Sequence, residues 1–384
     1  MSKRISYLFL IVVFVLSLFA GGGIAKAAPS DGPGRGKQKA VCASPAAGSA
    51  HCHARVFPMA STSPVGLTPA QMKAAYGFST SSTAGSGKTI AIVDAYDLPT
   101  AENDLNVFST QFGLPACTTA SGCFKKVSQT GTTSYPSYNA GWGLEIALDI
   151  EWAHAIAPGA HILLVEAKSA TDANLFAAED YAGAHANYVS NSWGGSESSS
   201  EKSYDSHFLQ TGVSYFVSAG DAGLPAEYPS TSPNVISVGG TLLTFNSSGK
   251  LVSETGWSSG GGGCSKYETA TAAQSAFGTY AQVKCAGKRA TPDVSLDADP
   301  NSGAAVYDSS RYSGQTGWYQ VGGTSLSSPM WAGRAAVSGA VINAAYIYGS
   351  NITFRDITSG NNGASCLVGF DLCSGRGSWT GTTP

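Results

Sequence analysis

The sequence predicts an α/β protein in which a doubly wound, mostly parallel sheet carries helices on both faces of a single large domain. Two observations support this. Apolar runs of strand length alternate with longer helical stretches, and the runs show little polar–apolar alternation, which is typical of strands buried on both faces. Apolar residues make up 43% of the 384 residues and charged residues only 12%, so the chain can bury a core.

The first 27 residues have the pattern of a secretory signal peptide. The basic start MSKR precedes the apolar run ISYLFLIVVFVLSLFA, and Ala25-Lys26-Ala27 forms a small-x-small cleavage site. A membrane anchor is the alternative, but the run is short for a span and Gly21-Gly22-Gly23 ends it. We therefore expect a secreted, extracellular protein with no membrane attachment after cleavage.

Residues 28–67 are rich in Gly, Pro, Ala and Ser, and the sequence predicts a poorly ordered arm or a propeptide remnant there. The main domain is expected over residues 68–384. It begins with the helix LTPAQMKAAYGF, with Thr68 as the cap and Pro69 as the first helical residue. The following GSGKT segment precedes its apolar strand instead of following it, so we expect no nucleotide site there.

The central part of the chain alternates strands and helices. Strands that end in Gly, Ser and Asp place those residues at the carboxyl edge of a parallel sheet, where open α/β sheets hold their sites. The expected strands are KTIAIVDA, HILLVEA, YVSNSW, VSYFVSAG and NVISVGGT, and the expected helices are TAENDLNVFSTQF, GLEIALDIEWAHAI and DANLFAAEDYAGA.

Eight cysteines fall into four pairs of near neighbours, which in an exported protein suggests local disulfides, although spacing alone does not fix the connectivity. No Cys-x-x-Cys pair supports a metal cluster instead. The net charge of −3 gives no electrostatic reason to expect nucleic acid as a partner. The near-neighbour pairs are Cys42 and Cys52, Cys117 and Cys123, Cys264 and Cys285, and Cys366 and Cys373.

The candidate nucleophile is Ser325, in the segment GGTSLSSPMWAG. It follows Gly323 and Thr324 and precedes a long helical run with Pro329 in the expected first turn. A hydroxyl at the positive end of a helix is favoured as an alkoxide, and Gly323 leaves room for a substrate backbone. A simple helix cap at Thr324 or Ser325 is the alternative.

A carboxyl group is the best candidate to take the proton from Ser325. Glu145 and Asp149 are four residues apart on an apolar helix, so they share one face, and one of two buried neighbouring acids should keep its proton at mild pH. His154 lies nine residues beyond Glu145 and would face away. Asp221, at the end of a strand in SAGDAG, could donate a hydrogen bond to an oxyanion if it stays protonated.

Together these segments resemble the sedolisins, the serine-carboxyl peptidases, over about residues 68–379. The resemblance implies a subtilisin-like fold and a set of catalytic residues in this chain: Glu145, Asp149, Asp221 and Ser325. Asp94, at the end of IAIVDAY, would support the Glu, and SNSWGG, residues 190–195, would pair with the substrate backbone. The chain departs from the family pattern at Gly322, where a serine is usual, and at Ala219. Only about fifty residues separate Ala27 from the catalytic domain, where a large folded prosegment is usual.

The resemblance also implies one Ca²⁺ ion near the C-terminus. Its ligands would be two carboxylates and three backbone carbonyls, and such oxygen-only ligands suit a hard cation. Leu367 stands where relatives usually have Gly, which a carbonyl ligand tolerates. The residues carried over are Asp356, Ile357, Leu367, Gly369 and Asp371.

We therefore expect a secreted peptidase, active at acidic pH as a monomer on peptide or protein substrates. One alternative keeps the fold but uses His154 with Asp94 as base and acid. The other is a secreted binding protein that has lost catalysis.

Overall fold

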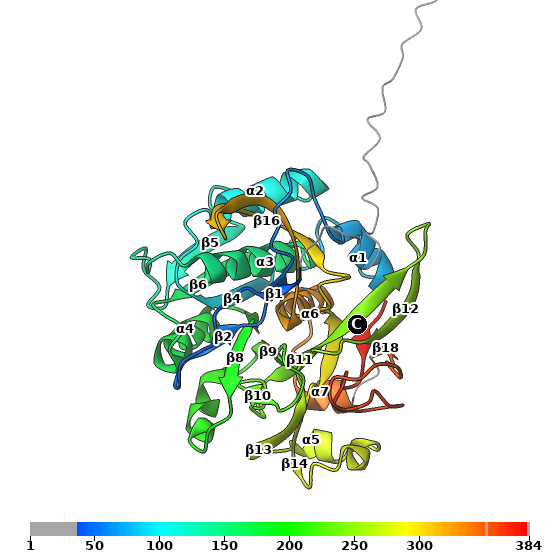
Figure 1. Cartoon of the computed structure of the whole chain (residues 1–384). Coiled ribbons are helices and arrows are strands. Elements are labelled where there is room, and N and C mark those ends of the chain that lie inside the picture. Colours follow the sequence, from blue (N-terminus) through cyan, green and yellow to red (C-terminus); the bar gives the residue numbers. More distant parts are fainter. Residues whose placement is uncertain (1–36, 350–351, 382–384) are drawn as a thin grey trace, which may run out of the picture.

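The computed structural model describes residues 37–349 and 352–381. The predicted signal peptide, residues 1–27, lies outside the described residues. Among those described, no helix is both long and apolar enough to cross a bilayer. The structure confirms the α/β class: one mixed sheet of eight strands forms the centre, with helices on both of its faces (Figure 1).

The strands of the central sheet are β4 (Thr89–Ala95), β5 (Phe124–Ser128), β6 (His161–Ala167), β7 (Tyr188–Asn191), β9 (Ser214–Ser218), β11 (Ile236–Phe245), β12 (Leu251–Gly256) and β15 (Val294–Asp297). Their order is β12-β11-β9-β7-β4-β6-β5, and β15 also pairs with β11. All of these pairs are parallel except β11–β12. The five strands expected from the sequence are β4, β6, β7, β9 and β11, and all five are confirmed.

Helices cover the sheet as the alternating pattern predicts. On one face α2 (Ala101–Phe112) packs on α3 (Ala140–Ile156), which packs on α6 (Thr324–Ser338), and Figure 1 shows α3 and α6 at the centre. On the other face α4 (Asp172–His185) packs on β4 and β6 and on the 3-10 helix η1 (Glu201–Phe208). The first helix, α1 (Pro69–Tyr76), begins as expected, with a capping box at Thr68. The three short helices are α5 (Ala272–Ser275), η2 (Tyr280–Val283) and α7 (Ala344–Gly349).

Smaller sheets surround the central one. A four-stranded sheet has the order β1-β3-β17-β16, a three-stranded sheet the order β10-β8-β2, and two pairs join β13 to β14 and β18 to β19. Their strands are β1 (Lys39–Ala40), β2 (His51–Cys52), β3 (Arg55–Val56), β8 (Trp193–Ser196), β10 (Glu227–Tyr228), β13 (Gly263–Thr269), β14 (Lys288–Thr291), β16 (Ala304–Tyr312), β17 (Gln315–Gly322), β18 (Phe354–Arg355) and β19 (Ser378–Trp379).

The expectation of a poorly ordered arm is wrong for residues 37–67. This segment contributes β1, β2 and β3 to two different sheets, and Figure 1 shows β2 running beside β8. Its side chains Val56 and Ala54 are fully buried. Pairing with strands that come much later in the chain orders a segment whose own composition indicates a flexible arm.

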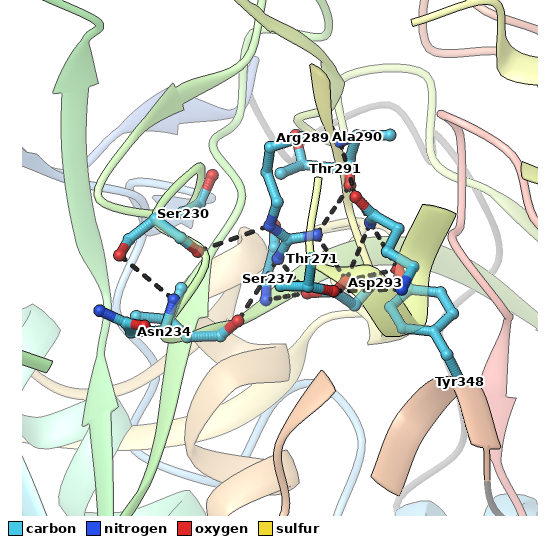
Figure 2. A network of polar contacts seen from close by, with 12 residues as sticks. Ser230, Asn234, Ser237, Thr271, Arg289, Ala290, Thr291, Asp293 and Tyr348 are labelled. Carbon is cyan, nitrogen blue, oxygen red and sulfur yellow. Dashed lines mark hydrogen bonds and ion pairs between the residues drawn. The ribbon is translucent and has the colours of Figure 1, made fainter. Parts of the chain in front are cut away.

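Covalent and ionic links brace the periphery. All four disulfides join the near-neighbour cysteines that the spacing suggested. Below the sheet, Arg289 on β14 forms a buried ion pair with Asp293, which also accepts hydrogen bonds from Tyr348 and from the backbone N–H of Ser237 (Figure 2). This network ties β11, β14 and α7 together, so removing either charge would leave the other buried without its partner.

Candidate active site

Ser325 lies at the start of α6, as predicted. It is the second residue of the helix, which begins directly after Gly323, and its side chain is fully buried. Pro329 is the sixth residue and therefore belongs to the second turn, not the first as expected. Because proline has no N–H, the carbonyl of Ser325 lacks its usual helical partner, and it accepts a hydrogen bond of 3.4 Å from the Ser192 hydroxyl instead.

Helix α3 brings Glu145 to Ser325. Both Glu145 and Asp149 are fully buried on this helix, which packs against α6. Burial and the nearby charge of Asp149 raise the pKa of Glu145 well above its usual value, and the neighbouring Ser325 hydroxyl opposes the shift. The Ser325 hydroxyl donates a long hydrogen bond, 3.4 Å, to the carbonyl oxygen of Ser192, so its proton is only weakly held.

Two further acids stand behind Glu145. Burial and the charge of Asp94 raise the pKa of Asp149 well above its usual range, although the nearby Ser192 side chain opposes the shift. Asp94, at the end of β4, is likewise buried, and its pKa is raised by burial and by the charges of Glu145 and Glu166. Neighbouring buried carboxyls cannot all ionise together, so this group shares protons at acidic and mild pH.

These raised pKa values predict that the fold is most stable in acid. A carboxyl whose pKa is higher in the folded than in the unfolded protein contributes its full stabilisation below the pKa of the unfolded state, near 4. This stabilisation is lost as the pH rises towards the pKa of the folded state. In Ser325→Ala protein, which cannot digest itself, the free energy of unfolding in urea should fall from pH 4 to pH 7. The loss should be about 1.4 kcal/mol per pH unit for each retained proton.

Adding Glu145→Gln and Asp149→Asn, which imitate the protonated acids, should flatten this pH dependence. A free energy of unfolding that stays level or rises between pH 4 and pH 7 would show that these carboxyls are ionised in the folded protein.

Asp221 lies across the start of α6 from Glu145. Its Oδ1 accepts a hydrogen bond of 2.8 Å from the backbone N–H of Thr324, whereas its buried Oδ2 has no hydrogen-bond partner among the described residues. Burial raises the pKa of Asp221 to about 6, even though the charge of His53, the Thr324 bonds and Arg55 all lower it. Below that pH Oδ2, which lies 3.6 Å from Nε of Arg55, can carry a proton.

The N-terminal arm passes through this site. Strand β2 pairs antiparallel with β8, in the SNSWGG segment predicted to hold substrate, and β3 pairs antiparallel with β17 just before Gly323. The two residues between these strands are His53 and Ala54. The backbone N–H of His53 donates to the carbonyl oxygen of Ser192 at 3.0 Å, the same atom that the Ser325 hydroxyl contacts.

The peptide group joining His53 to Ala54 lies between Glu145 and Asp221. The N–H of Ala54 donates to Oε2 of Glu145 at 3.0 Å, whereas the buried Oε1 has no hydrogen-bond partner among the described residues. A Cβ added to Gly323, whose φ is +97°, would lie 1.9 Å from the carbonyl oxygen of His53 and 2.8 Å from Oδ2 of Asp221. Gly323 thus leaves room for a peptide backbone beside the helix start. In this structure the backbone of His53 and Ala54 occupies that space.

The histidine expected to face away does so. His154 lies nine residues along α3 from Glu145, about 13 Å, and its Nε2 contacts the carbonyl oxygen of Pro115 at 2.9 Å. Burial lowers the pKa of His154 to about 4. It therefore cannot serve as the base for Ser325. Asp94, its suggested partner, stands beside Glu145 instead.

Sequence reasoning missed the contribution of the arm. His53, Ala54 and Arg55 line the site, and Arg55 donates to the carbonyl oxygen of Asp221 at 2.9 Å. One sequence signal could have indicated that this segment is folded: the Cys42–Cys52 pair, which forms a disulfide. Cys52 lies between the two histidines of the HCHAR segment. The Thr324 backbone N–H that holds Asp221 was missed as well.

The C-terminal loop gathers the predicted metal ligands. Asp371 accepts a hydrogen bond from the N–H of Leu367 at 2.6 Å, and Asp356 accepts one from Gly369 at 2.9 Å, so the two acids flank one turn. No hydrogen bond within the described chain occupies the carbonyl oxygens of Leu367 or Gly369. Ile357 is buried beside the Cys366–Cys373 disulfide, and its carbonyl oxygen accepts only a long contact, 3.5 Å, from the Ser374 hydroxyl. The donor set is oxygen-only and fits a hard cation.

Elsewhere in the described chain, two clusters of cysteine, histidine and glutamate side chains have the residue types and spacing of metal ligands, but neither is free to bind a metal ion. Cys117 and Cys123, beside His154, are joined in a disulfide. His53, which lies near His51 and Glu227, has both ring nitrogens in hydrogen bonds to protein side chains.

The model of the subtilase family matches residues 130–357, more than half of the chain. The chain belongs to the subtilase family.

The relatives of this subtilase-family chain are sedolisins. Kumamolisin from Bacillus sp. (strain MN-32) is 31% identical over 365 residues, covering 83% of this chain and 63% of kumamolisin. Sedolisin from Pseudomonas sp. (strain 101) is 33% identical over 207 residues, covering 44% of this chain and 33% of that protein. A solved Pseudomonas sedolisin, complexed with two molecules of pseudo-iodotyrostatin, superposes with a TM-score of 0.70 at 27% identity, over 83% of this chain and 96% of the other.

The predicted membership of the sedolisins, on a subtilisin-like fold, is thus confirmed. The chain spans less than two thirds of the length of the curated relatives it matches.

Proposed function

We propose that this chain is a secreted serine-carboxyl peptidase that hydrolyses peptide bonds at acidic pH. The observation that carries the proposal is one buried carboxyl, Glu145, which lies near enough to the Ser325 hydroxyl for that group to affect its pKa and which accepts a peptide N–H, that of Ala54. Membership of the subtilase family and the four disulfides, which are typical of extracellular proteins, support it. We expect it to act as a monomer on proteins or peptides.

Each side chain has a distinct role in this mechanism. In molecules where Asp149 or Asp94 holds the shared proton and Glu145 is ionised, Glu145 takes the proton of Ser325 as the oxygen attacks the carbonyl carbon, and then gives it to the leaving nitrogen. Asp149 and Asp94, by sharing protons with Glu145, set how strongly it holds that proton. Protonated Asp221 donates from Oδ2 to the developing oxyanion, and the Ser192 carbonyl oxygen fixes the substrate N–H beside the nucleophile.

A mixed peptide library incubated with the protein at pH 3 to pH 8 tests the proposal. Mass spectrometry should detect products below about pH 6, and Ser325→Ala protein should give none. Hydrolysis that survives the Ser325→Ala change would remove the serine from the mechanism. An optimum at or above neutrality would contradict the carboxyl base. A folded wild-type protein that cuts nothing would instead favour the binding-protein alternative.

We also propose that the loop with Asp356 and Asp371 binds one Ca²⁺ ion, which would brace the turn through Ile357, Leu367 and Gly369. An ion that binds only the folded chain stabilises it by about 2.7 kcal/mol when its free concentration is 100 times Kd. EDTA should therefore lower Tm by several degrees, and added Ca²⁺, but not Mg²⁺, should restore it. Asp371→Asn protein should not respond to either. An unchanged Tm of the wild type in EDTA would count against the site.

A further inference from the structure

A cluster of four acidic side chains joins three segments of the chain, away from the catalytic acids. Glu197 follows directly after β8, and Glu201 and Asp205 lie on the 3-10 helix η1. Glu268 lies on β13, and η1 contacts both β13 and α4. Glu201 is only 1% exposed and Glu268 only 3%. The cluster therefore lies at the joint where the end of β8, η1 and β13 meet.

Hydrogen bonds hold this joint together. Glu197 accepts a hydrogen bond from the hydroxyl of Ser265 on β13, and the same hydroxyl oxygen accepts the backbone N–H of Glu268 at 2.7 Å. Between β8 and η1, the backbone N–H of Ser198 donates to Oε2 of Glu201 at 2.7 Å. The segment after β8 is thus tied to β13 on one side and to the start of η1 on the other.

Each of the two most buried acids has one oxygen without a donor. Oε1 of Glu201 and Oε1 of Glu268 are buried, and neither has a hydrogen-bond partner within residues 37–349 and 352–381. A buried carboxylate with an unsatisfied oxygen is costly, and a proton on that oxygen removes the charge. The packing of both side chains therefore favours the protonated form.

Neighbouring charges act on Glu201 in the same direction as its burial. Burial, together with the charges of Glu197 and Glu268, raises the pKa of Glu201 to about 8, although a backbone N–H opposes the shift. From α4, Asp180 faces η1 and pairs with His207 at 2.8 Å. Glu201 thus holds a proton throughout the acidic range.

Glu268 responds to charges of both signs. Burial and the charge of Asp205 raise the pKa of Glu268 to about 7, whereas the charges of Lys202 and Lys288 lower it. Burial also raises the pKa of Asp205, against the hydrogen bond of 3.2 Å that its Oδ1 accepts from the Tyr228 hydroxyl. Glu268 therefore gives up its proton at a lower pH than Glu201.

The cluster consequently changes charge between acidic and neutral pH. Because the pKa of Glu201 and of Glu268 is raised in the folded protein, their stabilisation of the joint is complete below the pKa of the unfolded state, near 4. It is lost as the pH rises towards 7 to 8. The new negative charges then lie beside those of Glu197 and Asp205, and a movement of η1 away from β13 relieves the repulsion.

The joint borders the strand that is expected to hold the substrate. Glu201 and Tyr204 of η1 line one cavity together with Trp193 and Gly195 of β8. Strand β8 ends directly before Glu197, the residue that is bonded to β13. A movement of η1 away from β13 would therefore displace the end of β8 and one wall of this cavity.

We propose that Glu201 and Glu268 form an acid-dependent clamp that holds η1 and the end of β8 against β13 in acid and releases them as the pH approaches neutrality. The release weakens substrate binding, by a route separate from the ionisation of Glu145 and Asp221. This consequence for substrate binding rests on the proposed peptidase function, whereas the clamp itself does not.

Hydrogen exchange tests the clamp without catalysis. Ser325→Ala protein would be followed by mass spectrometry between pH 5 and pH 8, and exchange rates would be converted to protection factors, which correct for the intrinsic effect of pH. The protection factors of residues 197–208 should fall by at least about tenfold per pH unit from pH 5 to pH 7, the effect of one retained proton.

Variants of the clamp should remove this fall. Glu201→Gln combined with Glu268→Gln imitates the protonated acids, so the protection of residues 197–208 should change by less than about threefold per pH unit. Each single change should remove part of the fall, which gives the same test in milder variants. Glu102→Gln, a control on α2 outside the cluster, should keep the full fall.

The peptidase reaction supplies a second measurement. In the protein with an intact Ser325, KM for a peptide substrate should rise by at least about threefold from pH 5 to pH 7, because a smaller fraction of the molecules is able to bind. In the double Gln variant KM should stay level over this range. The value of kcat should still decline above about pH 6 in both proteins, because that decline belongs to Asp221.

The outcomes separate the clamp from the peptidase function. Protection of residues 197–208 that is independent of pH, or that falls equally in the double Gln variant, would overturn the clamp. A KM that rises equally in the variant would reject the effect on substrate binding. If no peptide is cut at any pH, the peptidase proposal fails, and hydrogen exchange still decides whether the clamp exists.

Discussion

Glu145→Gln protein is expected to lose at least about 10³-fold in kcat/KM for peptide hydrolysis while remaining folded. A glutamine has the shape of a protonated glutamate, so its amide oxygen can still accept the N–H of Ala54 at the position of Oε2. It cannot take the proton of Ser325, because an amide is not a base at these pH values. The serine then remains a poor nucleophile.

The control for this prediction is on the same helix. His154→Ala should retain activity, because His154 contacts Pro115 and not the serine. Circular dichroism and Tm of both variants would show that the fold survives each change. Activity that disappears in His154→Ala and persists in Glu145→Gln would mean that an imidazole is the base.

Asp221→Ala is expected to lower kcat by about 10²- to 10³-fold, the usual effect of removing one oxyanion donor. Asp221→Asn should behave quite differently. Its oxygen can keep the bond that Oδ1 makes with the N–H of Thr324, which places the amide NH₂ where Oδ2 now lies, 3.6 Å from Nε of Arg55. The variant therefore carries a donor that cannot ionise.

The dependence of activity on pH distinguishes a proton-donating role of Asp221 from a purely structural one. In the wild type, activity should decline above about pH 6, where Asp221 loses its proton, by about tenfold per pH unit. In Asp221→Asn this decline should move to higher pH while activity in acid is largely kept. If the decline stays at the same pH in Asp221→Asn, the ionisation of another group limits the reaction.

The catalytic helices were predictable because each signal is local. The four-residue spacing of Glu145 and Asp149 fixes their common face on any helix, and the apolar residues between them indicate burial. The start of α6 after Gly323 could be predicted in the same way, from the small residues that precede a long helical run. Near-neighbour cysteines likewise pair through short loops.

The arm was not predictable because its order comes from distant partners. Strands β2 and β3 have two residues each, too few to show any periodicity, and they are ordered by β8 and β17, which come more than a hundred residues later. The side chain of His53 also contacts Ser218 on β9 and Glu227 on β10, which come 165 and 174 residues later in the chain. No local pattern links such segments, so Ser218 and Glu227 escaped prediction.

The rate at which an alkyl fluorophosphonate labels Ser325, measured against pH, tests the carboxyl base most directly. Wild-type protein, Glu145→Gln and His154→Ala would be compared, with Ser325→Ala as the blank and mass spectrometry locating the label. We predict labelling at pH 4 to pH 5 in the wild type and in His154→Ala, and none in Glu145→Gln. Labelling only above neutrality, retained in Glu145→Gln and lost in His154→Ala, would contradict this account.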